Sequence, residues 1–245
     1  ILVCEVRMLS VITPAHNEAR LIAGCLASVQ AASRRTAEAA EHIVVLNRCT
    51  DDTGKIAEDY GARVITEDSR NIARVRNRGA AAARGRTIVT IDADSRMTPN
   101  MLAEVLRMLA TGAYVGGGVR IVPERLSIGL VCSLMVVAPF VWRYGVSAGM
   151  FWCLRRDFVA IGGFDEDLVC LEDIDFGRRL KRHGRSLGKR YGTVRRAQVV
   201  TSCRKFDQFG DWYFVKHPSV VYRLFRRDSR QADLFYYDAR SKNTP

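Results

Sequence analysis

Apolar positions in the first half of the chain follow two different periods in turn. Short runs rich in β-branched residues predict buried strands, and apolar residues every three or four positions predict helices. The expected strands are 9–13, 42–46, 63–66 and 88–91. Three of the expected helices are 20–32, 71–84 and 99–110, and a fourth is capped by 50–53 and ends near Gly61. Because strands and helices alternate, we expect an α/β fold with a largely parallel sheet.

The alternation ends after the glycines at 116–118. In the second half we expect strands near 114–122 and 149–154, a segment at 157–161, a turn at 162–165 and a helix from Glu172. The stretch 126–142 is strongly apolar, but it is shorter than the roughly 20 residues of a membrane-spanning helix and contains Pro139. It predicts a helix that is buried or lies on a membrane surface.

Two carboxylates directly follow the expected strand 88–91. Asp92 and Asp94 are separated by one residue and stand where a buried strand meets a loop. Burial of an ionised carboxylate is costly unless a cation or hydrogen-bond donors compensate it. Two hard oxygen ligands suit Mg²⁺ or Mn²⁺ completed by substrate phosphates. On this motif alone, a turn in which the Asp side chains accept local hydrogen bonds is the alternative.

Polar residues also follow two earlier strands. In a doubly wound sheet, the loops after parallel strands converge on one crevice at the carboxyl ends of the strands. The loops 14–18, 47–52 and 92–95 therefore predict a nucleotide site. The two early loops would hold the base and ribose, and the Asp pair would hold a diphosphate through a metal ion.

The composition fits one soluble-type domain with an excess of positive charge. The chain has 245 residues, 48% of them hydrophobic, and a net charge of +12. That charge favours anionic partners such as nucleotides, diphosphates, acidic lipid headgroups or nucleic acid. The seven cysteines are widely spaced without a CxxC pair, which favours reduced thiols in the cytoplasm. Residues 1–7 lack the basic and apolar regions of a signal peptide.

Six motifs occur in a fixed order along the chain. They are Pro14-x-x-Asn17-Glu18, Val44-Val45-Leu46-Asn47-x-x-Thr50-Asp51-x-Thr53, Arg76-Asn77-x-Gly79, Asp92-Ala93-Asp94, Gly162-Gly163-Phe164-Asp165 and Glu172-Asp173-x-Asp175. Together, over residues 9–183, they resemble family 2 glycosyltransferases of the GT-A fold. The resemblance implies one Rossmann-like α/β domain over 1–245. Its nucleotide-sugar half would be 1–115, its acceptor half 116–225 and its tail 226–245.

The resemblance implies an inverting transfer of a sugar from a nucleotide-diphosphate donor to an acceptor hydroxyl. Thr13 and Pro14 would contact the base, with Glu18 near the nucleoside. Asn47 stands where the family usually has an Asp, so a neutral amide oxygen would accept from the base. A UDP-sugar is the favoured donor, and GDP- and dTDP-sugars are the alternatives.

The cofactor implied by the resemblance is Mn²⁺ or Mg²⁺. Asp94 would ligate the metal directly, and Asp92 would contact the ribose or reach the metal through water, with Ala93 between them. Arg76 would bind the donor diphosphate, because guanidinium groups form bidentate bonds with phosphate oxygens; a solvent-exposed role on its helix is the alternative.

On the acceptor side, the resemblance implies that Asp173 is the general base and that Glu172 orients the acceptor or Asp173. Capping of the helix N-terminus is the alternative for these carboxylates, and Asp175 is expected to be structural. Phe151 and Trp152 are a candidate platform for a sugar ring, although burial is expected for at least one of them.

The late strand that carries a metal-ligating His in many GT-A enzymes has none here, over 199–205. Arg204 and Lys205 are expected to compensate diphosphate charge instead, and His217 is a weaker candidate as a metal ligand. No motif of processive polysaccharide synthases occurs, which favours transfer of single sugars.

Two other classes remain as alternatives. A nucleotidyltransferase would carry a Gly-rich, basic phosphate loop after the first strand, where this chain has Pro14-Ala-His-Asn-Glu18. A basic nucleic-acid-binding protein would bind independently of Asp92 and Asp94, and we do not expect a nucleic-acid partner. The expected acceptor is a glycan or a lipid-linked molecule. Charge together with the apolar stretch 126–142 leads us to expect peripheral contact with an anionic membrane at its cytoplasmic face.

Overall fold

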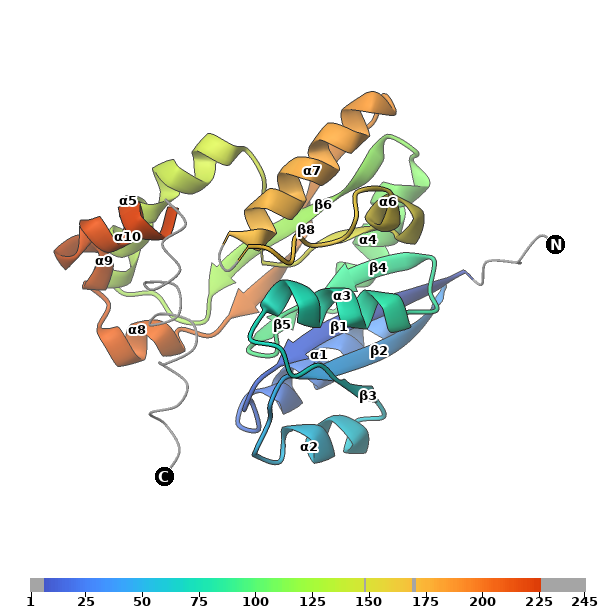
Figure 1. Ribbon diagram of the computed structural model, residues 1–245, viewed down its shortest axis with the longest axis horizontal. Helices are drawn as coiled ribbons and strands as arrows, with labels where there is room; N and C mark the ends of the chain where they lie inside the picture. The colour runs from blue at the N-terminus through green and yellow to red at the C-terminus, as the bar shows by residue number, and fades with distance from the viewer. Residues whose placement is uncertain (1–6, 148, 169–170, 226–245) are drawn as a thin grey trace.

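The computed structural model describes residues 7–147, 149–168 and 171–225, and within them an eight-stranded mixed sheet dominates (Figure 1). Its strand order is β3-β2-β1-β4-β7-β6-β8-β5. The expectations for residues 1–6, Cys170 and the tail 226–245 fall outside these residues.

The first half confirms the predicted alternation of strands and helices. Its parallel strands are β1 (Met8–Ala15), β2 (Ala39–Leu46), β3 (Arg63–Thr66) and β4 (Thr87–Thr90). The helices between them are α1 (Ile22–Ser33), α2 (Thr53–Asp59) and α3 (Ile72–Ala82). One boundary differs from the prediction: Pro14 lies inside β1, paired with Val45 of β2, so the loop begins two residues later than expected.

In the second half the sheet becomes mixed. Its elements are β5 (Ser95–Met97), α4 (Met101–Ala110), β6 (Tyr114–Pro123), β7 (Trp152–Leu154), α6 (Arg155–Ala160), α7 (Glu172–Ser186) and β8 (Arg190–Thr201). Strand β7 runs antiparallel to β4 and β6, whereas β8 is parallel to β6 and antiparallel to β5. The sequence pattern does not predict β5, which has only three residues and follows Asp94 directly.

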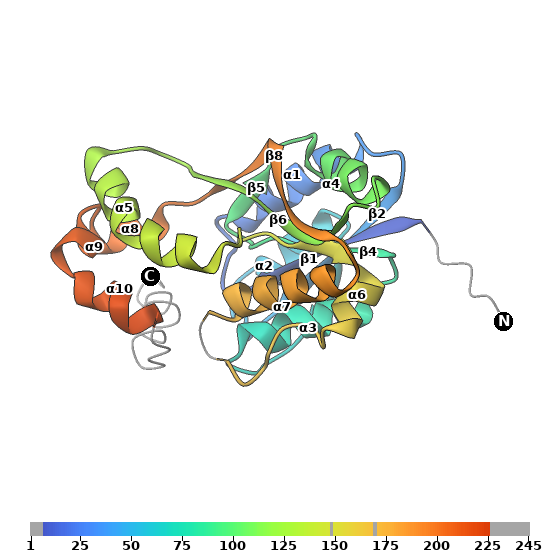
Figure 2. The ribbon, with the colours of Figure 1, turned by 90° about the horizontal axis from the view of Figure 1, so that it is seen from above.

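Helices cover both faces of the sheet. One core layer packs α1 and α4 on the sheet, and the other packs α3, α6 and α7 on the opposite face (Figure 2). A ring cluster at the centre of the second layer includes Phe164 stacked on Phe176 at 4.2 Å between centroids, with Phe151 and Phe158 at its edge. These aromatic contacts hold α6, α7 and the 162–165 turn together.

A group of helices lies beside the sheet, at the left of Figure 2. It consists of α5 (Ile128–Tyr144), α8 (Arg204–Phe209), α9 (Tyr213–Lys216) and α10 (Pro218–Phe225). Arg125, just before α5, joins this group by ion pairs with Asp207 and Asp211. From Ile128 on, the apolar stretch 126–142 is helical, as predicted. Among the described residues, no helix has the length and hydropathy to cross a membrane.

Candidate active site

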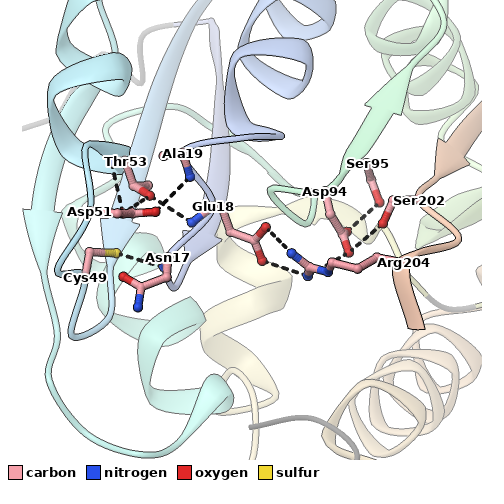
Figure 3. Close-up of polar contacts among 10 residues, drawn as sticks. All are labelled: Asn17, Glu18, Ala19, Cys49, Asp51, Thr53, Asp94, Ser95, Ser202 and Arg204. Atoms are coloured by element: carbon pink, nitrogen blue, oxygen red, sulfur yellow. Dashed lines mark hydrogen bonds and ion pairs between the residues drawn. The ribbon is translucent and has the colours of Figure 1, made fainter. Parts of the chain in front are cut away.

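The loops after β1 and β2 are locked together by side chain to backbone hydrogen bonds (Figure 3). Asn17 Oδ1 accepts from the Thr50 amide at 2.8 Å, and the Glu18 amide donates to Thr53 Oγ1 at 2.8 Å. Asp51 accepts from the Ala19 amide at 3.0 Å and from the Thr53 hydroxyl at 2.5 Å. The polar residues at 17–18 and 50–53 thus fix the loop geometry.

Asp51 is ionised in this arrangement. Burial alone would raise its pKa, but hydrogen bonds from Thr53 and Ala19 outweigh burial and lower the pKa below the ordinary value. Both of its carboxylate oxygens accept hydrogen bonds within the two loops, so its role is structural.

Directly after β2, the Asn47 side chain has only its oxygen available for a further hydrogen bond. The buried side chain donates both amide hydrogens to backbone carbonyls, at 2.5 Å to Glu67 O and 2.7 Å to Ser69 O. This orientation leaves Oδ1 as the side-chain atom that can still accept a hydrogen bond, and its role toward a base stays a prediction.

Thr13 does not offer its side chain to a ligand. It is fully buried, and its hydroxyl lies 2.8 Å from His42 Nε2. Burial lowers the pKa of His42 to about 4, so this pair is neutral. Thr13 and Pro14 can therefore contribute only as part of strand β1, through its backbone.

Asp92 and Asp94 follow β4 as predicted, but they have different surroundings. The Asp92 side chain is 41% exposed, whereas that of Asp94 is 20% exposed. Asp94 accepts hydrogen bonds from Ser95 Oγ and Ser202 Oγ, each at 3.3 Å. Ala93 between them is buried in the core against Ala15 and α1, so its side chain serves packing.

Arg204 makes a contact that the sequence predicts only in part. From the start of α8 it forms a bidentate pair with the buried Glu18, at 2.7 and 3.0 Å, and it also lies 3.5 Å from Asp94 Oδ2 (Figure 3). The motifs predict its charge near a diphosphate, but they do not predict that it joins Glu18 to Asp94, which lie 186 and 110 residues from it along the chain. Glu18 thus pairs with a cation, and its expected place near the nucleoside stays a prediction.

Arg76 joins the first half of the chain to the second. It is 7% exposed, so the exposed role on α3 is wrong. Its guanidinium donates to Asp92 at 3.0 Å and to Glu172 at 2.7 Å and lies over the Phe164 ring. Burial would lower its pKa, but Asp92 and Glu172 raise it above the ordinary value. The motif glycine at 79 lets α3 approach β1 closely enough for this reach, because a Cβ there would meet Ile12.

The Asp173 carboxyl at the start of α7 has an unusual proton affinity. Burial and the adjacent carboxylate of Glu172 raise its pKa to about 7, against the opposing effect of Arg76. It also accepts from the Ile174 amide at 2.7 Å. A carboxyl with this pKa can exchange a proton at neutral pH.

The turn before α7 is anchored on α3 through Asn77. Its amide nitrogen donates to Phe164 O and its oxygen accepts from Phe164 N, both at 2.8 Å. Gly163 adopts φ +67°, and a Cβ there would lie 2.6 Å from Asn77 Oδ1. Asp175 pairs with Arg179 at 2.6 Å, which confirms the structural role expected for it.

The burial expected for at least one of Phe151 and Trp152 is confirmed for both, and their candidate role as a sugar platform is wrong. Trp152 is fully buried and donates its indole N–H to Gly118 O at 2.9 Å, and Phe151 is 2% exposed within the aromatic cluster. Neither ring can act as a sugar platform, because core packing takes both. His217 packs against Tyr213, and within the described ranges no three His, Cys, Asp or Glu residues form a metal-binding group.

Backbone strain occurs directly beside three of the candidate site residues, Glu18, Asn47 and Glu172. The non-glycine residues with positive φ in the described chain are Asn17 at 50°, Arg48 at 50° and Leu171 at 61°. They precede Glu18, follow Asn47 and precede Glu172, respectively. Strained backbone concentrates at functional sites, and this signal cannot be read from the sequence because none of the three is glycine.

A sequence profile described as glycosyl transferase family 2 matches residues 10–164, which is well over half of the chain. The chain belongs to this family. Its relatives include the uncharacterized glycosyltransferases EpsJ of Bacillus subtilis, 28% identical over 69% of this chain, and Rv0539 of Mycobacterium tuberculosis, 31% identical over 45% of it. The chain spans 54% and 48% of their respective lengths.

Solved structures agree with the assignment of this family 2 glycosyltransferase to the GT-A fold. S. aureus TarS in complex with UDP-GlcNAc aligns with a TM-score of 0.63 at 17% identity, covering 93% of this chain and 70% of TarS. Glucosyl-3-phosphoglycerate synthase of M. tuberculosis, in complex with Mn²⁺, UDP and phosphoglyceric acid, aligns with a TM-score of 0.58 at 19% identity, covering 89% and 78%.

The carboxylates of this family 2 site fit a divalent metal. Asp92 and Asp94 provide hard oxygens with partial solvent access, and Mg²⁺ is commonly held by one or two carboxylates together with substrate phosphates. With two carboxylates after β4, the site suits a metal completed by a diphosphate.

Proposed function

We propose that the chain catalyses an inverting, metal-dependent transfer of a sugar from a nucleotide-diphosphate-sugar to an acceptor hydroxyl. The observation that carries the proposal is the Arg76 bridge between Asp92 and Glu172. One buried cation from α3 ties Asp92, a candidate metal ligand, to Glu172, the neighbour of the candidate base Asp173. Family membership makes this function far better supported than the nucleotidyltransferase alternative.

The donor would lie across the ends of β1, β2 and β4. Asn47 Oδ1 is an acceptor for a base N–H, since both of its amide hydrogens are already used. A uracil N–H suits that oxygen, and TarS and glucosyl-3-phosphoglycerate synthase were solved with UDP-GlcNAc and UDP, respectively. We therefore favour a UDP-sugar over GDP- and dTDP-sugars.

Asp94 and Asp92 would hold Mn²⁺ or Mg²⁺. When bound, the metal would neutralise the leaving diphosphate. Arg204 lies beside the same carboxylate, 3.5 Å from Asp94 Oδ2, and supplies a second positive charge at the phosphate end of the site. Arg76 keeps Asp92 in place from the opposite side.

Asp173 would remove the proton from the acceptor hydroxyl as that oxygen attacks the anomeric carbon opposite the diphosphate. Its pKa of about 7 matches this task at neutral pH, because the group is partly ionised and still basic enough to accept the proton. Glu172, held by Arg76 at 2.7 Å, would position Asp173 and raise its basicity by charge repulsion. The acceptor would be a glycan or lipid-linked hydroxyl.

A thermal-shift panel with UDP-, GDP- and dTDP-sugars, each with and without Mn²⁺, tests the donor. A donor at a hundred times its dissociation constant stabilises the folded state by about 2.7 kcal/mol, roughly 5–10 °C for a chain of this size. We expect the shift to need Mn²⁺ and to disappear in Asp94→Asn, but to persist in the matched control Asp59→Asn on the exposed side of α2.

The anomeric configuration of the product, measured by NMR, tests inversion. If no nucleotide-sugar shifts the melting temperature, or if Asp94→Asn and Asp59→Asn behave alike, the proposed function is wrong.

A further inference from the structure

A groove between the end of α5 and the outer face of α7 is lined with positive charge. It encloses about 730 Å³, and its lining residues are Arg143, Arg178, Lys181, Arg182 and Arg185. The four from α7 are spaced by three and four residues, which places them on one side of the helix. The other side of α7 packs on the sheet through buried Ile174, Leu180 and Gly184.

Several of the positive side chains that line the groove are not neutralised by a neighbouring carboxylate. Across the described ranges, no carboxylate forms an ion pair with Arg143, Arg182 or Arg185. The Lys181 ammonium donates to the Gly145 carbonyl at 2.9 Å, a neutral acceptor that keeps the charge at the groove. Like charges gathered in one concave place repel each other, and anions lying between them would relieve that repulsion.

The helix that forms one wall of the groove has an apolar outer face. Arg143 is the only charged residue of α5. Large exposed side chains on or just before this helix are Leu126, Ile128, Val131, Leu134 and Met135, with Ile128 78% and Met135 67% exposed. Neighbouring helices add the exposed rings Trp212 and Tyr222. Exposed apolar side chains gathered in this way mark an interaction surface.

We propose that α5 and the outer face of α7 form a docking surface for a lipid bilayer with anionic headgroups. The groove cations would bind lipid phosphates, and the apolar face of α5 would enter the boundary between headgroups and acyl chains. The exposed Trp212 and Tyr222 are side chains that favour this interface.

Charge complementarity favours an anionic bilayer over a nucleic acid, a free phosphate or a second copy of the chain as the partner of this surface. A nucleic acid or a free phosphate would match the groove but would leave the apolar face of α5 in water. A second copy of the chain carries the same net charge of +12 and would bring like charges together. An anionic bilayer alone satisfies both the cations and the apolar side chains.

The bilayer contact stands independently of the proposed function, and only its use for a lipid-borne acceptor rests on that function. Helix α7 carries Asp173 at its start and Arg178 five residues later, which is about 7 Å along the helix axis. An acceptor whose phosphate lay in the groove would therefore extend toward the candidate base. This deepens the proposed function by naming the acceptor class: a hydroxyl carried on an anionic lipid.

Co-sedimentation of the full chain with vesicles tests the docking surface. Vesicles of phosphatidylcholine with and without phosphatidylglycerol are compared at physiological salt in the absence of donor, and binding is expected only with phosphatidylglycerol. Each basic residue near an anionic surface contributes about 1 kcal/mol, so Arg182→Ala with Arg185→Ala should weaken binding roughly 30-fold. Ile128→Ser with Met135→Ser should weaken it as well.

The matched control is Arg34→Ala with Arg35→Ala, which removes the same charge from exposed positions at the end of α1. It should retain nearly all binding. Equal losses in the two arginine double variants would mean that net charge alone attracts the protein, and the docking surface would be wrong. The docking surface would also be wrong if the chain ignores anionic vesicles, or if inorganic pyrophosphate or an RNA oligonucleotide binds the groove while vesicles do not.

Donor binding distinguishes this inference from the proposed function. Arg182→Ala with Arg185→Ala should keep the full thermal shift with nucleotide-sugar and Mn²⁺, which also reports that the variant is folded. Loss of vesicle binding with an intact donor shift is the expected result. Vesicle binding by a chain that responds to no nucleotide-sugar would overturn the proposed function and leave the docking surface standing.

Discussion

Replacement of Asp173 by Asn should stabilise the protein while abolishing sugar transfer. The pKa of Asp173 is about 7 in the folded chain, against an ordinary value of 3.8. Above pH 7 the carboxyl is ionised in both the folded and the unfolded chain, and only the folded chain carries the cost of an ionised group that is buried beside Glu172. At about 1.36 kcal/mol per pKa unit, a shift of about 3 units corresponds to about 4 kcal/mol at most.

The sign of the pH dependence follows from proton binding. Below about pH 4 the carboxyl is protonated in both states, so this residue contributes no difference in the free energy of unfolding. Between about pH 4 and pH 7 the folded chain binds more protons than the unfolded chain, so wild-type stability falls as pH rises. Asn has no such proton, and the gain from Asp173→Asn should therefore grow across this window and level off above pH 7.

Urea denaturation of wild type and Asp173→Asn at several pH values between 4 and 9 measures the gap between their free energies of unfolding. Subtracting the two curves cancels carboxylates whose pKa is lowered, such as Asp51. The control Asp175→Asn should lose stability instead, because it breaks the pair with Arg179. In the wild type, kcat/KM should rise with pH toward a plateau above 7. A pH-independent gap, or a variant less stable than wild type at pH 8, would refute the reasoning.

Three further substitutions test individual contacts. Arg204→Gln leaves the buried Glu18 carboxylate without its bidentate partner and should cost about 3 kcal/mol in urea denaturation; an unchanged midpoint would contradict the bridge. Gly163→Ala places a methyl group 2.6 Å from Asn77 Oδ1 at φ +67° and should lower stability by about 1–3 kcal/mol, measured as a melting temperature that falls by several degrees. Arg76→Lys keeps the charge but cannot hold two carboxylates at once, so kcat/KM should fall roughly 30-fold; wild-type kinetics would show that one contact suffices.

The first half of the fold could be predicted because its signals are local. Short β-branched runs and helical periodicity predict β1 to β4 and the helices between them, with differences only at their ends. The carboxyl ends of parallel strands meet by geometry, so the grouping of the loops after β1, β2 and β4 also follows from the sequence. The three residues of β5 carry too little pattern, because its strand state depends on pairing with β8 at a distance of about a hundred positions.

The sequence motifs could predict the candidate site residues one by one, but they could not predict which of these residues contact each other. The motifs identify Arg76, Asp92 and Glu172 separately, yet their union in one ion-pair network around the buried Arg76 depends on how closely α3 packs on β1. The sugar platform failed for a related reason. Trp152 lies on a short strand between β4 and β6, and a central strand buries side chains that the sequence alone cannot distinguish from pocket walls.

Helix α8 connects Glu18 and Asp94, which follow β1 and β4, to the outer helices. Its first residue, Arg204, grips Glu18, while Phe206 packs edge-on against Phe214 of α9, and α9 in turn contacts α5. A continuous series of contacts therefore runs from α5 through α9 and α8 to Glu18 and Asp94. The short helix that packs against the outer group is thus also the one that presents the Arg204 guanidinium to both carboxylates.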